Sequence, residues 1–222
     1  QKYAPHSQCR AQQASKHTIS YVDHGIFQNQ LAIVMELGNN SLRNFMTRLL
    51  RLELISEIIQ QLVIGVRYMH SLHVSHRDLK PDNVLICQNT IKICDFGFSC
   101  NSSQNPQIRR HTICGTLPYM APEIFIHRKL GYRVFPVDVW AIGVISYELI
   151  HKSLAFEGRT LKEMKIKIMN GVHRPFKIGL PQVFMKFVDE CLIKNPTKRP
   201  NIYDIKYPQK KSKLIGDDDK PS

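Results

Sequence analysis

The sequence has no hydrophobic run that could span a bilayer, which takes roughly 20 consecutive apolar residues. Its longest apolar stretch, residues 139–150, is interrupted by Gly143, Ser146 and Glu148. No apolar signal segment follows Gln1, and a Gln in place of an initiator Met is typical of a fragment or a processed chain. We therefore expect no transmembrane helix, no membrane partner, and a location inside the cell, in the cytoplasm or the nucleus.

The cysteines lack the spacing of a disulfide framework or a zinc site. The chain has six of them, with no CxxC pair and no regular interval between them. The absence of such a pattern predicts free thiols in a reducing compartment.

Acidic residues are few relative to basic ones. The chain carries 31 Lys and Arg against 18 Asp and Glu, a formal net charge of +13. Such an excess could attract nucleic acid, but the basic residues are scattered, and the only compact run, 206–213, falls in a polar tail. We expect no nucleic-acid partner, and we keep nucleic-acid binding as the weakest alternative.

The pattern of the 222 residues predicts an α+β fold with a dominant helical body. We expect strands at 17–27 and 30–37, joined by a turn at Gln28 and Asn29, and a second hairpin formed by 84–86 and 91–94. A helix should begin after Ser41, a natural N-cap, and a longer amphipathic helix should cover 53–72. The further helices are expected at 137–150, 161–170, 182–194 and 202–205.

Three polar side chains on one short loop point to chemistry. Asp78, Lys80 and Asn83 stand within six residues, before the predicted hairpin of 84–94. Phosphoryl transfer needs such a set: a carboxylate to orient the attacking hydroxyl, an ammonium to neutralise the moving phosphoryl group, and an amide oxygen to bind Mg²⁺. Asp95 follows the hairpin and could be a second ligand of that metal. Gly97 would allow the backbone to bend there.

Five ordered motifs carry a family resemblance. HRDLKPDN (76–83), DFG (95–97), GTLPYMAPE (115–123), DVWAIG (138–143) and NPTKRP (195–200) follow the order and approximate spacing of the protein kinase superfamily. The chain resembles a serine/threonine kinase over residues 17–205. Its activation segment is similar to that of Aurora kinases, and other features resemble calmodulin-dependent and phosphorylase kinases.

The resemblance implies an architecture and a reaction. Residues 1–37 would be the remnant of the kinase N-lobe, 38–206 the helical C-lobe, and 207–222 a polar, disordered tail. The implied activity is transfer of the γ-phosphoryl group of ATP to Ser or Thr of protein substrates, with Mg²⁺.

The resemblance also assigns roles to single residues. It implies that Asp78 is the catalytic base, assisted by Lys80, and that Asn83 and Asp95 are the Mg²⁺ ligands. Nucleotide-binding positions are implied at the gatekeeper, at the hinge and beneath the adenine: Met35, Glu36, Leu37 and Leu85. Structural roles are implied for Thr116, beside Asp78 and Lys80, for the Glu123–Arg199 ion pair, and for Asp138, which would hold the HRD backbone.

Regulation and substrate choice are further expectations from the resemblance. Thr112 stands where related kinases carry an activating phosphothreonine, and Arg77 would pair with its phosphate. Because Arg109 and Arg110 precede Thr112, we expect a basophilic upstream kinase to phosphorylate Thr112. Acidic positions at Asp82 and Glu148 imply a modest preference for substrates with an upstream basic residue.

One part of the kinase pattern is missing. No GxGxxG occurs in the sequence, and no strand lysine precedes residue 17. The helix glutamate should stand near Gln8, yet residues 1–16 contain no Asp or Glu. We therefore expect this chain by itself to be an inactive fragment of a kinase. The alternative is a pseudokinase or docking module that uses the helical lobe to bind partners.

Overall fold

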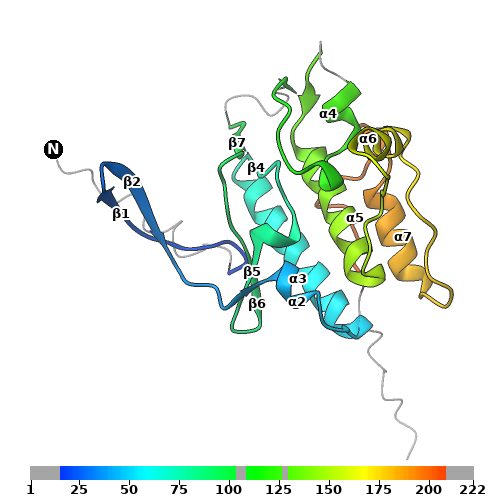
Figure 1. Cartoon of the computed structure of the whole chain (residues 1–222), viewed down its shortest axis with the longest axis horizontal. Coiled ribbons are helices and arrows are strands. Elements are labelled where there is room, and N and C mark those ends of the chain that lie inside the picture. Colours follow the sequence, from blue (N-terminus) through cyan, green and yellow to red (C-terminus); the bar gives the residue numbers. More distant parts are fainter. Residues whose placement is uncertain (1–15, 104–108, 127–129, 209–222) are drawn as a thin grey trace, which may run out of the picture.

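The computed structural model describes residues 16–103, 109–126 and 130–208. It is a mixed α and β structure in which small two- and three-stranded sheets lie beside a helical body (Figure 1). None of the helices in these described segments is long and apolar enough to cross a membrane.

The first element is a two-stranded hairpin that projects from the body (Figure 1). Strands β1 (Tyr21–Phe27) and β2 (Gln30–Met35) pair antiparallel, and Gln28 and Asn29 adopt positive φ angles of 50° and 61°. Two successive residues with positive φ form the turn that suits a two-residue hairpin. The two predicted strands and their turn are present, but the first strand begins at Tyr21 rather than at residue 17 and the second ends at Met35 rather than at residue 37.

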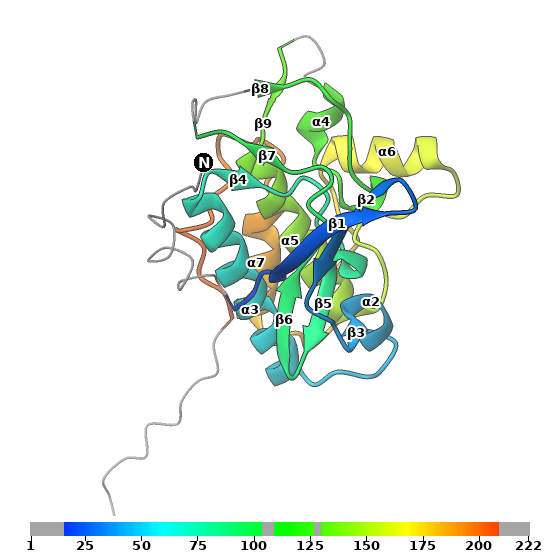
Figure 2. The ribbon, with the colours of Figure 1, turned by 90° about the vertical axis from the view of Figure 1, so that its left-hand side faces the viewer.

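A second sheet connects this hairpin to the body. Strands β3 (Asn40–Ser41), β5 (Val84–Cys87) and β6 (Thr90–Ile93) lie in the order β3-β5-β6, as Figure 2 shows. Gln88 and Asn89 form the turn between β5 and β6, again with positive φ. The predicted hairpin over 84–94 is therefore confirmed, and it brings the loop before β5 and the loop after β6 to one end of the sheet.

The helix expected after Ser41 is much shorter than predicted. Ser41 caps it as expected, because its hydroxyl accepts a hydrogen bond from Asn44 N at 3.2 Å, but α2 covers only Leu42–Phe45. The carbonyl of Met46 instead accepts a hydrogen bond from Lys152 Nζ at 2.9 Å. A tertiary contact therefore replaces the continuation of the helix.

The helical body is built around α5 (Phe135–His151), which lies between α3 (Leu52–Ser71) and α7 (Gln182–Cys191) (Figures 1 and 2). Nearly every residue of α5 is buried, as expected for a helix that is apolar on all sides. Gly143 permits the close approach of α7, since a Cβ at this position would lie 2.6 Å from Cys191 Cβ. Helix α6 (Leu161–Asn170) and the short α4 (Pro122–Ile126) complete the body.

Short elements flank the second hairpin on both sides in the sequence. Strand β4 (Val74–Ser75) pairs with β7 (Cys100–Asn101), and β8 (Arg109–Arg110) pairs with β9 (Tyr132–Arg133). Two 3₁₀ turns, η1 (Pro81–Asn83) and η2 (Leu117–Tyr119), flank the site described below.

Two of the expected helices differ from the structure. Residues 202–205 form a turn rather than a helix, and Arg67 binds the carbonyls of Ile202 and Ile205 at 3.0 and 2.8 Å. Helix α7 ends at Cys191 instead of residue 194, where the Lys194 carbonyl accepts a hydrogen bond from Arg199. Gln8 and the tail beyond residue 208 lie outside the described residues.

Candidate active site

The loop between β4 and η1 carries the central group of the site. Asp78 is 5% exposed, and its Oδ2 accepts a hydrogen bond from Lys80 Nζ at 3.0 Å. Thr116 joins the two, because its hydroxyl donates to Asp78 Oδ1 at 2.9 Å and accepts from Lys80 Nζ at 2.9 Å. A carboxylate, an ammonium and a hydroxyl thus form one closed triangle.

Gly115 allows Thr116 to come this close. Its φ is +104°, in the region that favours glycine, and a Cβ there would lie 2.8 Å from the Arg77 carbonyl oxygen. Any larger residue would push the Thr116 segment away from the loop that carries Asp78.

Asn83 completes the cluster from η1. Its side-chain nitrogen donates to the Asp78 carbonyl at 3.0 Å and to Asp78 Oδ2 at 3.2 Å. With the nitrogen oriented inward by these two bonds, the amide oxygen is the atom that could bind a cation. The three residues predicted from the sequence as one set, Asp78, Lys80 and Asn83, are in mutual contact.

Asp138, on α5, fixes the backbone of this loop. It is fully buried, and its carboxylate accepts hydrogen bonds from the backbone nitrogens of His76 and Arg77 at 2.9 and 2.8 Å. Ser75 Oγ at 2.9 Å and His70 Nε2 at 2.8 Å also bind it. Burial alone would raise the pKa of Asp138, but the hydrogen bond from His70 and the bonds from the loop lower it below its ordinary value.

His76 links this loop to the segment that follows β6. Its Nε2 binds the Cys94 carbonyl at 2.9 Å, and its ring lies 5.3 Å from that of Phe96. Asp95 follows with a φ of 62° and an exposed side chain whose Oδ1 accepts from Gly97 N at 3.3 Å. Burial raises the pKa of the neighbouring Cys94 thiol to about 11, as expected for a packing residue rather than a reactive thiol.

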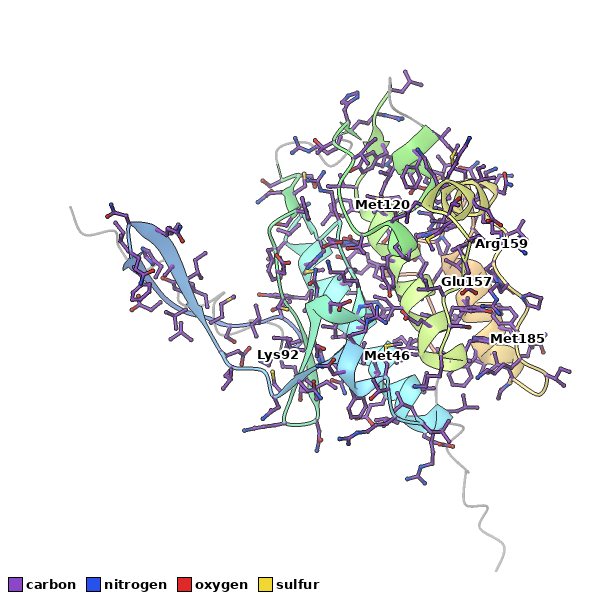
Figure 3. The ribbon with its side chains drawn as sticks, in the orientation of Figure 1. Met46, Lys92, Met120, Glu157, Arg159 and Met185 are labelled. Carbon is purple, nitrogen blue, oxygen red and sulfur yellow. The ribbon has the colours of Figure 1, made fainter. Side chains whose placement is uncertain are left out.

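The four residues predicted to bind the nucleotide lie at the end of β2, in the segment that follows it, and on β5. Leu85, on β5, packs against the backbone at Gly38, where an added Cβ would lie 2.9 Å from the Leu85 side chain. Glu36 pairs with Lys92 Nζ at 2.7 Å, at the junction between the projecting hairpin and the sheet (Figure 3). Burial alone would raise the pKa of Glu36, but the bonds from Lys92 and Ser20 lower it. Met35 and Leu37 are exposed, at 47% and 92%, and no contact assigns any of these four residues to a ligand.

The candidate active site offers few protein ligands for a metal ion. In the described segments, no group of three or more His, Cys, Asp and Glu side chains could hold a metal ion. Asn83 and Asp95 offer oxygen atoms, which suit Mg²⁺, and an ion of this kind completes its coordination with water and substrate phosphates. The donor set fits a metal that arrives with a nucleotide rather than a resident metal centre.

Arg77 and Thr112 are connected through Tyr132. The Tyr132 hydroxyl donates to the Thr112 carbonyl at 2.8 Å and accepts from Arg77 Nη1 at 3.3 Å. Arg77 Nε donates to the Phe98 carbonyl at 2.7 Å, and the Thr112 side chain is exposed. Burial raises the pKa of Tyr132 to about 12, so its hydroxyl stays protonated at neutral pH. The two residues predicted to be regulatory therefore belong to one bonded group.

The ion pair predicted between Glu123 and Arg199 is present and almost fully buried. Arg199 Nη1 and Nη2 donate to Glu123 Oε1 and Oε2 at 2.7 and 3.0 Å. Arg199 also binds the carbonyls of Ile193 and Pro136. This two-pronged contact ties the segment after Thr116 to the chain that follows α7.

Sequence reasoning missed one residue beside the site. Arg43, on α2, donates to Glu148 Oε1 at 2.5 Å, to the hydroxyl of Tyr119, and to Asp82 Oδ2 at 3.4 Å. The sequence around Arg43 does not indicate a role at the site, because a basic residue on a short helix is usually solvated. The acidic residues Asp82 and Glu148 were the only indication that a basic partner could lie nearby.

Comparison with known proteins gives consistent matches. The family model described as the protein kinase domain matches residues 7–208. CBL-interacting protein kinase 15 of Oryza sativa subsp. japonica is 41% identical over 152 residues, which cover 66% of this chain and 34% of that protein. CBL-interacting protein kinase 14 of the same organism is also 41% identical over 152 residues, covering 66% of this chain and 33% of its own length. The chain thus spans about a third of the length of these curated relatives.

Proposed function

Because this chain belongs to the protein kinase family, we propose that it is the catalytic-loop-bearing part of a serine/threonine kinase that transfers the γ-phosphoryl group of ATP to protein hydroxyls. The observation that carries the proposal is the closed triangle of Asp78, Lys80 and Thr116, with distances of 2.9 to 3.0 Å.

Asp78 acts on the acceptor hydroxyl. Its carboxylate is held by Lys80, Thr116 and Asn83, and Asp138 fixes the backbone of the two residues before it. A carboxylate so oriented can accept a hydrogen bond from a Ser or Thr hydroxyl and align its oxygen for attack. Lys80, with an ammonium 3.0 Å from that carboxylate, would neutralise charge on the transferred group.

The nucleotide would lie between the two hairpins. We propose that Leu85 packs against the adenine, that the backbone of the 35–37 segment binds its polar edge, and that Met35 bounds the pocket. We propose Mg²⁺ as the cofactor, bound by Asn83 and Asp95, where it would supply charge neutralisation to the phosphates.

The chain by itself should transfer phosphate poorly. It contains no glycine-rich loop and no counterpart of the family's phosphate-binding strand lysine, and these groups supply much of the electrostatic attraction for the phosphates. The same feature favours the second candidate, a pseudokinase or docking module. The intact triangle around Asp78 supports the enzyme, since a protein that only binds partners has no need for it.

We propose that phosphorylation of Thr112 regulates the site. A phosphate adds about −1.5 to −2 charges. Arg77 is already bonded to Tyr132, which binds the Thr112 carbonyl, so the phosphate would meet an arginine next to Asp78. The proposed partners are protein substrates and a basophilic upstream kinase, and the proposed compartment is the cytoplasm or the nucleus.

The test uses a completed kinase, in which this chain follows a segment of an active kinase that carries the glycine-rich loop and the strand lysine. Asp78→Asn should lower turnover by about 10³-fold or more and leave ATP affinity nearly unchanged, because Asp78 acts on the hydroxyl. Asp204→Asn, an exposed change of equal charge, is the control and should keep full turnover.

The 222-residue chain alone is assayed in parallel and should show no incorporation of phosphate. Equal turnover in the wild-type completed kinase and its Asp78→Asn variant would contradict the assignment of the base. Robust incorporation by the chain alone, lost in Asp95→Ala, would show that the phosphate-binding groups lie within it. A completed kinase that binds peptides but never transfers phosphate would favour the docking module.

A further inference from the structure

Arg43 bridges two acidic side chains that come from distant parts of the chain. Its guanidinium binds Glu148 Oε1 at 2.5 Å, on α5, and Asp82 Oδ2 at 3.4 Å, in η1. Tyr119, in η2, contributes to the same cluster, since its hydroxyl donates to Glu148 Oε2 at 2.6 Å and accepts a hydrogen bond from Arg43. We call these four residues the Arg43 cluster.

The Arg43 cluster adjoins the Asp78 triangle. Asp82 lies between Lys80 and Asn83 in the sequence, and Tyr119 follows Thr116 by three residues. Tyr119 and Asp78 also line one small cavity together with Thr116. A polypeptide that presents a hydroxyl to Asp78 therefore passes within reach of the Arg43 cluster.

The charges of the Arg43 cluster do not cancel. Two carboxylates face one guanidinium, so removal of Arg43 would leave two negative charges beside the acceptor site. Glu148 is 7% exposed, whereas the side chains of Arg43 and Asp82 are 36% and 50% exposed. The cluster is therefore open to solvent on the side of Arg43, where a cation from another chain could take its place.

We propose that Arg43 sets the charge selectivity of the protein-substrate site by occupying the acidic pair Asp82 and Glu148. A basic side chain of a substrate would have to displace a guanidinium that already makes three hydrogen bonds, and the net gain would be close to zero. The chain therefore does not select substrates with an arginine near the acceptor, although it has the carboxylates to do so. This proposal rests on the proposed kinase function, and it replaces the modest basic preference expected from Asp82 and Glu148 alone.

Peptide binding tests the proposal without the need for phosphoryl transfer. Fluorescence anisotropy measures the affinity of the 222-residue chain for serine peptides with one arginine, placed in turn at each of several positions before the serine, and for the matching glutamine peptides. Wild type should bind every pair with equal affinity within about twofold. Arg43→Gln should bind at least one arginine peptide about tenfold more tightly than its glutamine partner, because a charge-assisted hydrogen bond contributes that much.

Two variants separate the Arg43 cluster from net charge. Arg48→Gln removes an equal charge from an exposed position and should behave as wild type. Adding Glu148→Gln to Arg43→Gln should abolish the gained preference. Thermal unfolding of each variant reports whether it is folded.

Several results would overturn the proposal. The wild-type chain could already prefer an arginine peptide more than threefold. A folded Arg43→Gln variant could show no preference. Finally, peptide binding could be absent in every variant. If Arg43→Gln does not fold, the wild-type comparison still decides. Failure of the kinase function would appear differently, as a completed kinase without turnover whose peptide selectivity still follows Arg43.

Discussion

Replacement of Asp138 should reveal how strongly the helical body holds the catalytic loop. Its buried carboxylate accepts four hydrogen bonds, two of them from the backbone nitrogens of His76 and Arg77. Asp138→Ala removes the acceptor of the His76 and Arg77 nitrogens and of His70, whereas the Ser75 hydroxyl keeps the Val134 carbonyl. Removal of one side of such a buried charged network costs about 3–5 kcal/mol. The asparagine variant keeps one acceptor oxygen and should cost less, about 1–3 kcal/mol.

Urea denaturation of the chain, followed by circular dichroism, measures this loss. Asp204→Asn serves as the exposed control and should change the free energy of unfolding by less than about 0.5 kcal/mol. An Asp138→Ala variant that is destabilised by less than about 1 kcal/mol would refute the reasoning, because the four bonds would then contribute little.

The pH dependence of the free energy of unfolding tests the role of Asp138 a second time. Because the pKa of Asp138 is lower in the folded than in the unfolded state, its ionised form contributes stability above the unfolded value of about 3.9. That contribution is lost as the pH falls below this value through the folded pKa. The stability difference between wild type and Asp138→Asn should therefore decrease as the pH falls below about 4. A difference that persists unchanged to pH 3 would contradict the assigned pKa direction.

Two further predictions concern the segment that follows Asp95. In the completed kinase, Thr112→Ala should lower activity at least about tenfold, equivalent to roughly 1.4 kcal/mol, because the phosphate that would bind Arg77 is lost; undiminished activity in a peptide phosphorylation assay would remove Thr112 from the mechanism. Gly115→Ala should lower turnover and cost about 1–3 kcal/mol of stability, since the new Cβ would lie 2.8 Å from the Arg77 carbonyl. A Gly115→Ala enzyme with wild-type turnover would show that Thr116 can reach Asp78 by another backbone path.

Elements with a long, regular pattern could be predicted from the sequence. Helix α3 and both hairpins follow directly from apolar spacing and from the turn residues at 28–29 and 88–89. Helix α2 could not be predicted in length, because the bond that replaces its next turn comes from Lys152, more than 100 residues away. The helix expected at 202–205 failed for a similar reason, since Arg67 binds its carbonyls.

The candidate site likewise contains residues whose contacts could be predicted from the sequence and residues whose contacts could not. Asp78, Lys80 and Asn83 lie so close in the sequence that their contact could be predicted, and Thr116 and Asp138 were expected only through the family resemblance. The position of Arg43 was not predictable, because its partner Glu148 lies 105 residues further along the chain. Side chains that meet only through the packing of α2 on α5 and η1 leave no local pattern.

The projecting hairpin has a consequence for how the chain behaves in concentrated solution. Among the residues that the structure describes, no third strand pairs with β1 or β2, and the segment Gln30–Met35 carries no charge. Uncharged, largely apolar strands with open edges can pair with copies of themselves. We therefore expect any self-association of this polypeptide to begin at the projecting hairpin, outside the core, while the helical body stays folded.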